Sequence, residues 1–145
     1  MANNYQQWST EITDLTEEEM TWFNECFAWE PSDEEGADGP AWYDWDAEGV
    51  GFEYELKRKV GSLHVYAEEF GNLCTLEALM REFIEKFRPN YLFTVQWADS
   101  CSRMRVDEFG GGAMVVSRLR TEYIDTYRWC QDLVKKMEEE LKGGS

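Results

Sequence analysis

The sequence predicts one α+β domain whose elements follow the order α-ββ-α-ββ-α. Its 145 residues match the size of a single ordinary domain. Three segments carry apolar residues at helical spacing, and four shorter ones alternate apolar with polar residues as strands do. Because strands recur in adjacent pairs between helices, we expect one four-stranded sheet, antiparallel or mixed, with the helices packed on one face.

The first helix has a well-marked beginning. Thr16 is the expected N-cap, and Glu19 follows three residues later, so the two side chains can form a capping box. We expect the helix to end near Trp29, because Pro31 follows it and the residues before a proline disfavour helix. Residues 1–14 are expected to form an extended or frayed lead-in.

The later elements follow from hydrophobic periodicity. The expected strands are residues 52–59, 63–70, 91–98 and 112–119. Two further helices are expected at residues 75–88 and 126–141, the last of them buried through Tyr127, Cys130, Leu133, Val134, Met137 and Leu141. The domain therefore spans residues 15–142, with an acidic part at 15–56, a charge-balanced part at 57–142 and a short tail at 143–145.

Charge is the strongest functional signal in the chain. The formal net charge is −16, and all of it comes from the residues up to Leu56, which include sixteen acidic residues and no lysine or arginine. Residues 57–145 hold fourteen acidic and fourteen basic residues. An acidic block repels nucleic acids and anionic membranes and attracts basic proteins. Half of the 22 aromatic residues also lie in this block, which argues against a merely solvating tail.

Other classes of protein are disfavoured by simple counts. No apolar run is long enough to span a membrane, and the first fourteen residues lack the pattern of a secretory signal. Cys26, Cys74, Cys101 and Cys130 form no C-x-x-C pair and, with one histidine, do not suggest a zinc site. We expect buried free thiols, a cytoplasmic location in a bacterial host cell, and no cofactor.

The segment from Asp44 to Glu55 resembles a calcium-binding loop in part. Asp44, Asp46 and Glu48 occupy ligand positions, a glycine follows, and Glu55 stands where the bidentate glutamate belongs. The match is incomplete, because no helix is expected before Asp44 and the residues after the loop alternate like a strand. We therefore predict no metal site, although calcium binding remains an alternative.

A glycine-rich segment between the third and fourth strands allows two interpretations. Gly110, Gly111 and Gly112, preceded by Arg103 and Arg105, could cradle an anion with backbone amides, with Asp107 or Glu108 as metal ligand or base. The segment could equally be a long hairpin whose glycines permit a bulge or a positive φ, and whose arginines pair with acids of the domain. We favour the hairpin.

Nucleophilic catalysis has weaker support. Cys101 and Ser102 have only His64 as a possible base in the whole chain. A histidine on a strand is more often a structural residue, so no catalytic residue is predicted.

The acidic and aromatic block is the predicted partner-binding site. Regularly spaced carboxylates can imitate the phosphates of a nucleic acid, and exposed aromatic side chains can anchor an interface. The predicted binding residues are Glu17, Glu18, Glu25, Asp33, Glu34, Glu35, Asp38, Trp42, Asp44, Trp45, Asp46 and Glu48.

Two stretches carry a resemblance to other proteins. They read AEEFGNLCTLEALMREFIEKFRP and WADSCSRMRVDEFGGGAMVV, and the most specific part is C-S-x-x-R-x-D-E-F-G-G-G-A. Over residues 67–117 the chain resembles a family of small uncharacterised proteins of bacteria and their phages, which implies a setting but no activity. The charge pattern is also loosely similar to phage-encoded nucleic-acid mimics that block restriction or CRISPR effectors.

These observations predict an acidic, protein-binding inhibitor encoded by a phage or mobile element. It would occupy the basic nucleic-acid-binding groove of a host defence protein. An immunity protein that neutralises a toxin is the first alternative, because it shares the acidity and the basic partner. A small enzyme or anion-binding domain that uses Gly110, Gly111 and Gly112 is the second.

Overall fold

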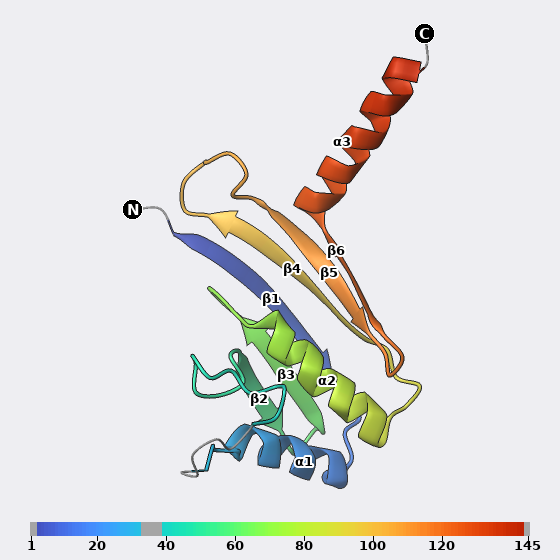
Figure 1. Ribbon diagram of the computed structural model, residues 1–145. Helices are drawn as coiled ribbons and strands as arrows, with labels where there is room; N and C mark the ends of the chain where they lie inside the picture. Colours follow the sequence, from blue (N-terminus) through green and yellow to red (C-terminus); the bar gives the residue numbers. More distant parts are fainter. Residues whose placement is uncertain (1–2, 33–38, 144–145) are drawn as a thin grey trace.

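A computed structural model describes residues 3–32 and 39–143 of the chain. The elements, in chain order, are β1 (Asn4–Ile12), α1 (Glu17–Ala28), β2 (Glu53–Lys57), β3 (Ser62–Ala67), α2 (Leu73–Phe87), β4 (Phe93–Cys101), β5 (Gly110–Val116), β6 (Thr121–Asp125) and α3 (Thr126–Gly143). The fold is α+β, as predicted, and its strands form a single sheet (Figure 1).

The sheet is antiparallel throughout and has six strands in the order β2-β3-β1-β4-β5-β6. The prediction of four strands was therefore wrong. The expected lead-in forms β1, a central strand that pairs with both β3 and β4. The second missed strand, β6, pairs with β5 after a tight turn in which the Ser117 N–H donates to the Arg120 carbonyl oxygen.

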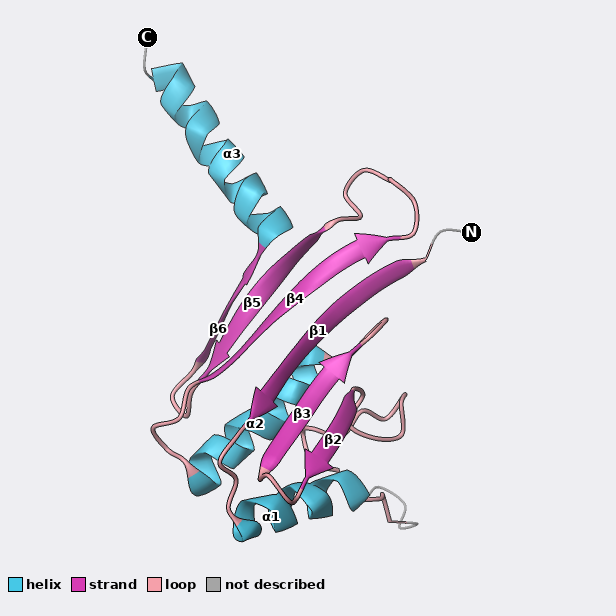
Figure 2. Cartoon of the chain, turned by 180° about the vertical axis from the view of Figure 1, so that it is seen from behind, coloured by secondary structure: helices cyan, strands magenta, loops and turns pink. Residues whose placement is uncertain are grey.

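One face of the sheet carries the main core. Trp8 and Ile12 of β1, Val65 of β3 and Phe93 of β4 are buried on this face. Residues of both α1 and α2 belong to this core, and Figure 2 shows α2 behind β1 and β3, with α1 next to the ends of β2 and β3. Apart from Ser62, the other face carries half-buried or exposed side chains, most of them polar, so it needs no second layer.

The third helix departs from the prediction. Residues of α1 and α2 are buried against the sheet, but none of residues 126–143, all of which are described, is buried. In both views α3 projects beyond the end of β6, away from the other helices (Figures 1 and 2). The expectation that all helices pack on one face, and that α3 is buried through its apolar side chains, is therefore wrong for α3.

Within the described ranges, no helix is long and apolar enough to cross a membrane. All four cysteines are free thiols, and Cys26 and Cys101 are buried as expected, but Cys74 and Cys130 are exposed. Burial raises the pKa of the Cys26 thiol to about 12, so that thiol is inert.

Candidate partner-binding surface

The exposed side of α1 supplies the first part of the acidic surface. The predicted capping box is present, because the Thr16 hydroxyl accepts a hydrogen bond from the Glu19 N–H (3.1 Å) and the Glu19 carboxylate accepts one from the Thr16 N–H (2.9 Å). This start orients Glu17, Glu18 and Glu25 to solvent. The three carboxylates line one shallow hollow, together with Thr21, Trp22, Lys86 and Phe87.

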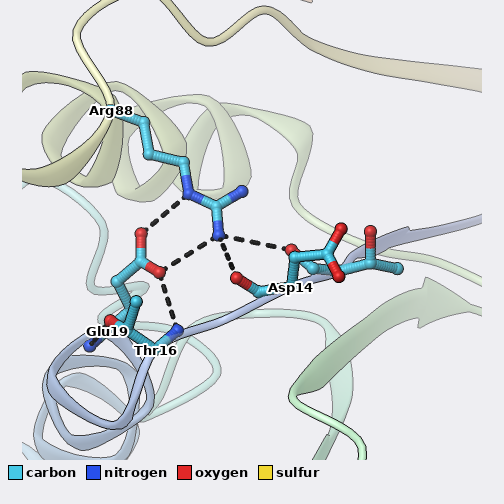
Figure 3. A network of polar contacts seen from close by, with 5 residues as sticks. Asp14, Thr16, Glu19 and Arg88 are labelled. Carbon is cyan, nitrogen blue, oxygen red and sulfur yellow. Dashed lines mark hydrogen bonds and ion pairs between the residues drawn. The ribbon is translucent and has the colours of Figure 1, made fainter.

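Glu19, in contrast, is buried and serves the fold. Its carboxylate accepts hydrogen bonds from Nε (2.8 Å) and Nη2 (3.1 Å) of Arg88. The same Nη2 donates to the carbonyl oxygens of Thr13 and Asp14, so one guanidinium ties α2 to the entry of α1 (Figure 3). Burial alone would raise the pKa of Glu19, but the bonds from Arg88 and Thr16 and the charge of Arg88 together lower it.

The second part of the surface is the turn between α1 and β2. Asp44 Oδ1 accepts the N–H groups of Asp46 (3.0 Å) and Ala47 (3.1 Å), and Oδ2 accepts the side-chain amide of Asn72 (2.8 Å). These bonds, with that from Asn72 the largest cause, lower the pKa of Asp44. The carboxylate of Asp44 is therefore engaged within the fold, whereas Asp46 and Glu48 point into solvent.

Asp44 also supports α2 through Asn72. The Asn72 side chain caps α2 by accepting the N–H groups of Cys74 (3.0 Å) and Thr75 (3.1 Å). Both oxygens of Asp44 are thus engaged within the fold. Across residues 3–32 and 39–143, no three His, Cys, Asp or Glu side chains cluster as metal ligands would.

The aromatic side chains of this region divide into core and surface. Trp42 and Tyr43 are buried, so Trp42 is not an anchor and that prediction was wrong. Trp29 packs edge-on against Trp42, Tyr43 and Trp45. Trp45 is 55 % exposed and is held in place from one side by this cluster. It is the aromatic side chain of the predicted set that can contact a partner.

A hollow of about 770 Å³ lies beside the edge strand β2. Its acidic lining is Asp44, Asp46, Glu48 and Glu53, and its aromatic lining is Phe27, Phe52, Tyr54 and Phe70. Phe27 of α1 stacks on Tyr54 of β2, which makes this wall rigid. A hollow lined by both carboxylates and aromatic rings suits a lysine or arginine side chain, which can form an ion pair and a cation–π contact at once.

Little of this surface is neutralised within the protein. Of the described carboxylates before Lys57, those of Glu17 and Glu19 lie within ion-pair distance of a basic side chain. The Glu17–Arg58 pair is long (3.5 Å) and exposed, so it contributes little. The remaining predicted binding residues Asp33, Glu34, Glu35 and Asp38 lie outside the described residues.

The three consecutive glycines have a structural explanation. They belong to β5 and not to an open loop, and the Gly111 N–H donates to the Thr126 hydroxyl (3.0 Å). A side chain at Gly112 would overlap the Trp97 ring and the Ile124 carbonyl oxygen, so glycine is required by close approach. None of the three has a positive φ, and the described part of the chain gives Arg103 and Arg105 no ion pair, so both details of the hairpin interpretation were wrong.

The histidine lies far from the two residues that it was considered to activate. Nε2 of His64 is 2.7 Å from the Ser9 hydroxyl, and the imidazole stacks on Tyr66. His64 faces Glu11 on β1, whereas Cys101 faces Asn4 at the opposite end of that strand. Seven residues of strand separate these positions by about 23 Å. His64 therefore cannot act on Cys101 or Ser102.

No protein-family model matches the chain, and neither a curated protein nor a solved structure matches it.

Proposed function

We propose that the protein binds a basic protein through its acidic surface and occupies the groove in which that partner holds nucleic acid. The acidic surface is defined by Glu17, Glu18, Glu25, Asp46 and Glu48, with Trp45 as its aromatic anchor. The observation that carries the proposal is that these carboxylates are exposed and, apart from the weak pair of Glu17, lie within ion-pair distance of no basic side chain among the described residues.

The geometry suits the imitation of a phosphate backbone. Glu18 and Glu25 are seven residues apart on α1, which corresponds to a rise of about 10.5 Å. Measured along the axis of a duplex, three phosphate steps of one strand rise by nearly the same amount, at about 3.4 Å for each step. The helix also fixes the backbone of these residues, so little backbone entropy is lost on binding.

The acidic hollow supplies selectivity for a protein over a simple cation. Its aromatic wall can accept the aliphatic and planar parts of an arginine, while Asp46 and Glu48 pair with the charge. A partner evolved to bind phosphates presents such side chains in its groove. The proposed target is therefore a nucleic-acid-handling protein, and a host defence effector fits the phage-borne setting that the sequence suggests.

The experiment compares matched two-charge variants. Glu18→Gln/Glu25→Gln alters α1, Asp46→Asn/Glu48→Gln alters the hollow, and Asp132→Asn/Glu139→Gln removes the same charge from α3 at the other end of the molecule. Partners are captured from host lysate at about 0.1 M salt, where the Debye length is about 10 Å. Association rates are then measured with the purified partner over a range of salt concentrations.

We expect each acidic-surface variant to lower the association rate at least several-fold and to flatten its salt dependence, with the α3 variant unchanged. Nucleic acid should compete with the protein for the partner. Equal effects of all three variants would show that only the overall charge matters, and would refute the proposed surface. Capture of a nuclease toxin whose activity is neutralised would instead establish the immunity function.

A further inference from the structure

We propose that α3 and β6 form an interface with a second copy of this chain, in which the two α3 helices pack antiparallel. The starting observation is that α3 has 18 residues and that none of them is buried. Figures 1 and 2 show it standing clear of the sheet, with no other helix beside it. An isolated helix of this length is marginally stable in water, so its stability requires packing that one copy does not supply.

The helix carries a seam suited to another helix. Its apolar side chains recur at intervals of three and four residues, the spacing of the two inner positions of a coiled-coil heptad. The seam consists of Tyr127, Cys130, Val134, Met137 and Leu141. Every one of these side chains is exposed in the single copy. Charged residues occupy the opposite side, as expected of a helix that packs through one stripe.

A groove runs along this seam. Its volume is about 720 Å³, and it lies between Phe109 of the β4–β5 connection and the seam residues Tyr127, Cys130 and Val134. Gln131, Lys135 and Glu138 line the same groove and can form polar contacts at its rim. The groove therefore offers an apolar floor with a polar margin, which is the arrangement found in stable interfaces.

The exposed apolar area fits a dimer. Tyr123 of β6 is 69 % exposed, and the seam residues Tyr127, Val134, Met137 and Leu141 are 49–81 % exposed. Since aromatic side chains bury 150–250 Å² each, the two tyrosines and the aliphatic seam residues expose roughly 500 Å² of apolar surface. A standard interface buries about 800 Å² on each partner, and about 65 % of a homodimer interface is apolar. The two estimates agree.

The charges of α3 favour a second copy over a charged partner. Residues 126–143 hold four acidic and four basic side chains, so two such helices approach without net repulsion despite the −16 charge of each chain. The acidic surface lies at the other end of the molecule, near α1 (Figure 1). A balanced helix has no electrostatic attraction for nucleic acid or for an anionic membrane.

The order of these charges selects the antiparallel arrangement. Glu138, Glu139 and Glu140 lie together near the C-terminus, and Arg128 lies near the N-terminus. Parallel helices would place the three glutamates of both copies side by side. Antiparallel helices place them beside Arg128 and the positive N-terminal end of the other helix dipole. With Val134 near the twofold axis, Cys130 of one copy then faces Met137 of the other.

The test is the mass of the full chain in solution, measured by sedimentation equilibrium, for the wild type and two variants. We expect the wild type to have twice the chain mass of 17.1 kDa, and Val134→Glu/Met137→Glu to have the mass of a single chain. Asp132→Asn/Glu139→Gln changes the side of α3 opposite the seam and leaves Glu138 and Glu140 in place, so this variant should remain a dimer. Because all four side chains are exposed, circular dichroism and the melting temperature of the main domain serve to verify that each variant folds.

Cross-linking tests the orientation. In a Cys74→Ser background, which leaves Cys130 as the exposed native thiol among the described residues, Met137→Cys should give a disulfide-linked dimer through Cys130 under mild oxidation. Without Met137→Cys no cross-link is expected. A single-chain mass at every concentration, a dimer that survives Val134→Glu/Met137→Glu, or a Cys130–Cys130 cross-link would each overturn the proposal.

Discussion

The Arg88 guanidinium binds both oxygens of the Glu19 carboxylate, at 2.8 and 3.1 Å, and thereby joins the end of α2 to the first turn of α1. The Glu19 side chain is 5 % exposed and that of Arg88 23 % exposed. A carboxylate this well shielded is stable in its charged form because Arg88 and the Thr16 N–H supply its hydrogen bonds. Because of this contact Glu19 stabilises the fold, whereas its exposed neighbours Glu17 and Glu18 are available for binding.

The first prediction concerns this ion pair. Glu19→Gln keeps an acceptor for the capping box but removes the charge that Arg88 requires, so we expect the free energy of unfolding to fall by about 1.5–3 kcal/mol. The measurement is urea unfolding at neutral pH. Glu18→Gln, one residue away and exposed, is the matched control and should change stability by less than about 0.5 kcal/mol. Equal effects of the two variants would contradict the assigned role of Glu19.

The second prediction concerns how the difference in unfolding free energy between the wild type and Glu19→Gln depends on pH. The folded-state pKa of Glu19 lies below the ordinary value, so its stabilisation is complete above that ordinary value and is lost as the pH falls through the folded-state pKa. The stability gap between the wild type and Glu19→Gln should therefore be widest near neutral pH and shrink in acid. A gap that stays constant or widens in acid would show that the charge of Glu19 is not what stabilises the fold.

The third prediction concerns Asp99, whose pKa is shifted in the opposite direction to that of Glu19. Burial, and then the charge of Asp125, raise the pKa of Asp99, although a hydrogen bond with Gln6 opposes them. A raised folded-state pKa means that charged Asp99 costs stability at neutral pH and that this cost disappears in acid. Asp99→Asn should raise the melting temperature by a few degrees at neutral pH and change it little in acid. Asp107 is exposed and lines the same surface hollow as Asp99, so Asp107→Asn is the control and should leave the melting temperature unchanged at neutral and at acid pH.

The elements predicted best from the sequence are those that their own residues specify. The capping box of Thr16 and Glu19 fixes the start of α1 within a few residues, and α2 has a broad apolar stripe. By contrast, β1 is rich in asparagine and glutamine, and its signal is the weak alternation of Trp8, Thr10 and Ile12. It is a strand because β3 and β4 pair with both of its edges, which no local pattern reveals.

The C-terminal elements show a different limit. β6 was missed because no side chain of residues 121–125 is buried, so alternation gives no contrast. For α3, periodicity predicted the apolar stripe correctly but not what covers it. The stripe was assumed to face the domain's own sheet, and the structure leaves it exposed.

The candidate surface was predictable in charge but not in detail. Composition indicates an acidic segment, yet it does not distinguish carboxylates that bind a partner from those that hold the fold. Asp44 and Glu19 belong to the second kind, because hydrogen bonds within the chain occupy their oxygens. Trp42 is likewise in the core, whereas Trp45, three residues later, is exposed. These distinctions depend on tertiary contacts with Asn72, Arg88 and Trp29.

The fourth prediction separates the two kinds of carboxylate within one turn. Asp44→Ala removes the acceptor for two backbone N–H groups and for the Asn72 amide that holds the cap of α2, so we expect a loss of about 1–2 kcal/mol of stability. Asp46→Ala should leave stability within about 0.5 kcal/mol while it weakens partner binding. Urea unfolding measures the first effect and association kinetics the second. A destabilised Asp46→Ala protein would show that this carboxylate also serves the fold.

The fifth prediction tests why β5 begins with three glycines. A methyl group at Gly112 would overlap both the Trp97 ring and the Ile124 carbonyl oxygen, and neither can move without disturbing a neighbouring strand. Gly112→Ala should therefore destabilise the fold by about 1–3 kcal/mol. Gly49→Ala is the control, because no atom lies within 4 Å of its added methyl group, and it should be nearly neutral. If Gly112 instead served an anion site, Gly112→Ala would leave the unfolding free energy unchanged and abolish phosphate binding.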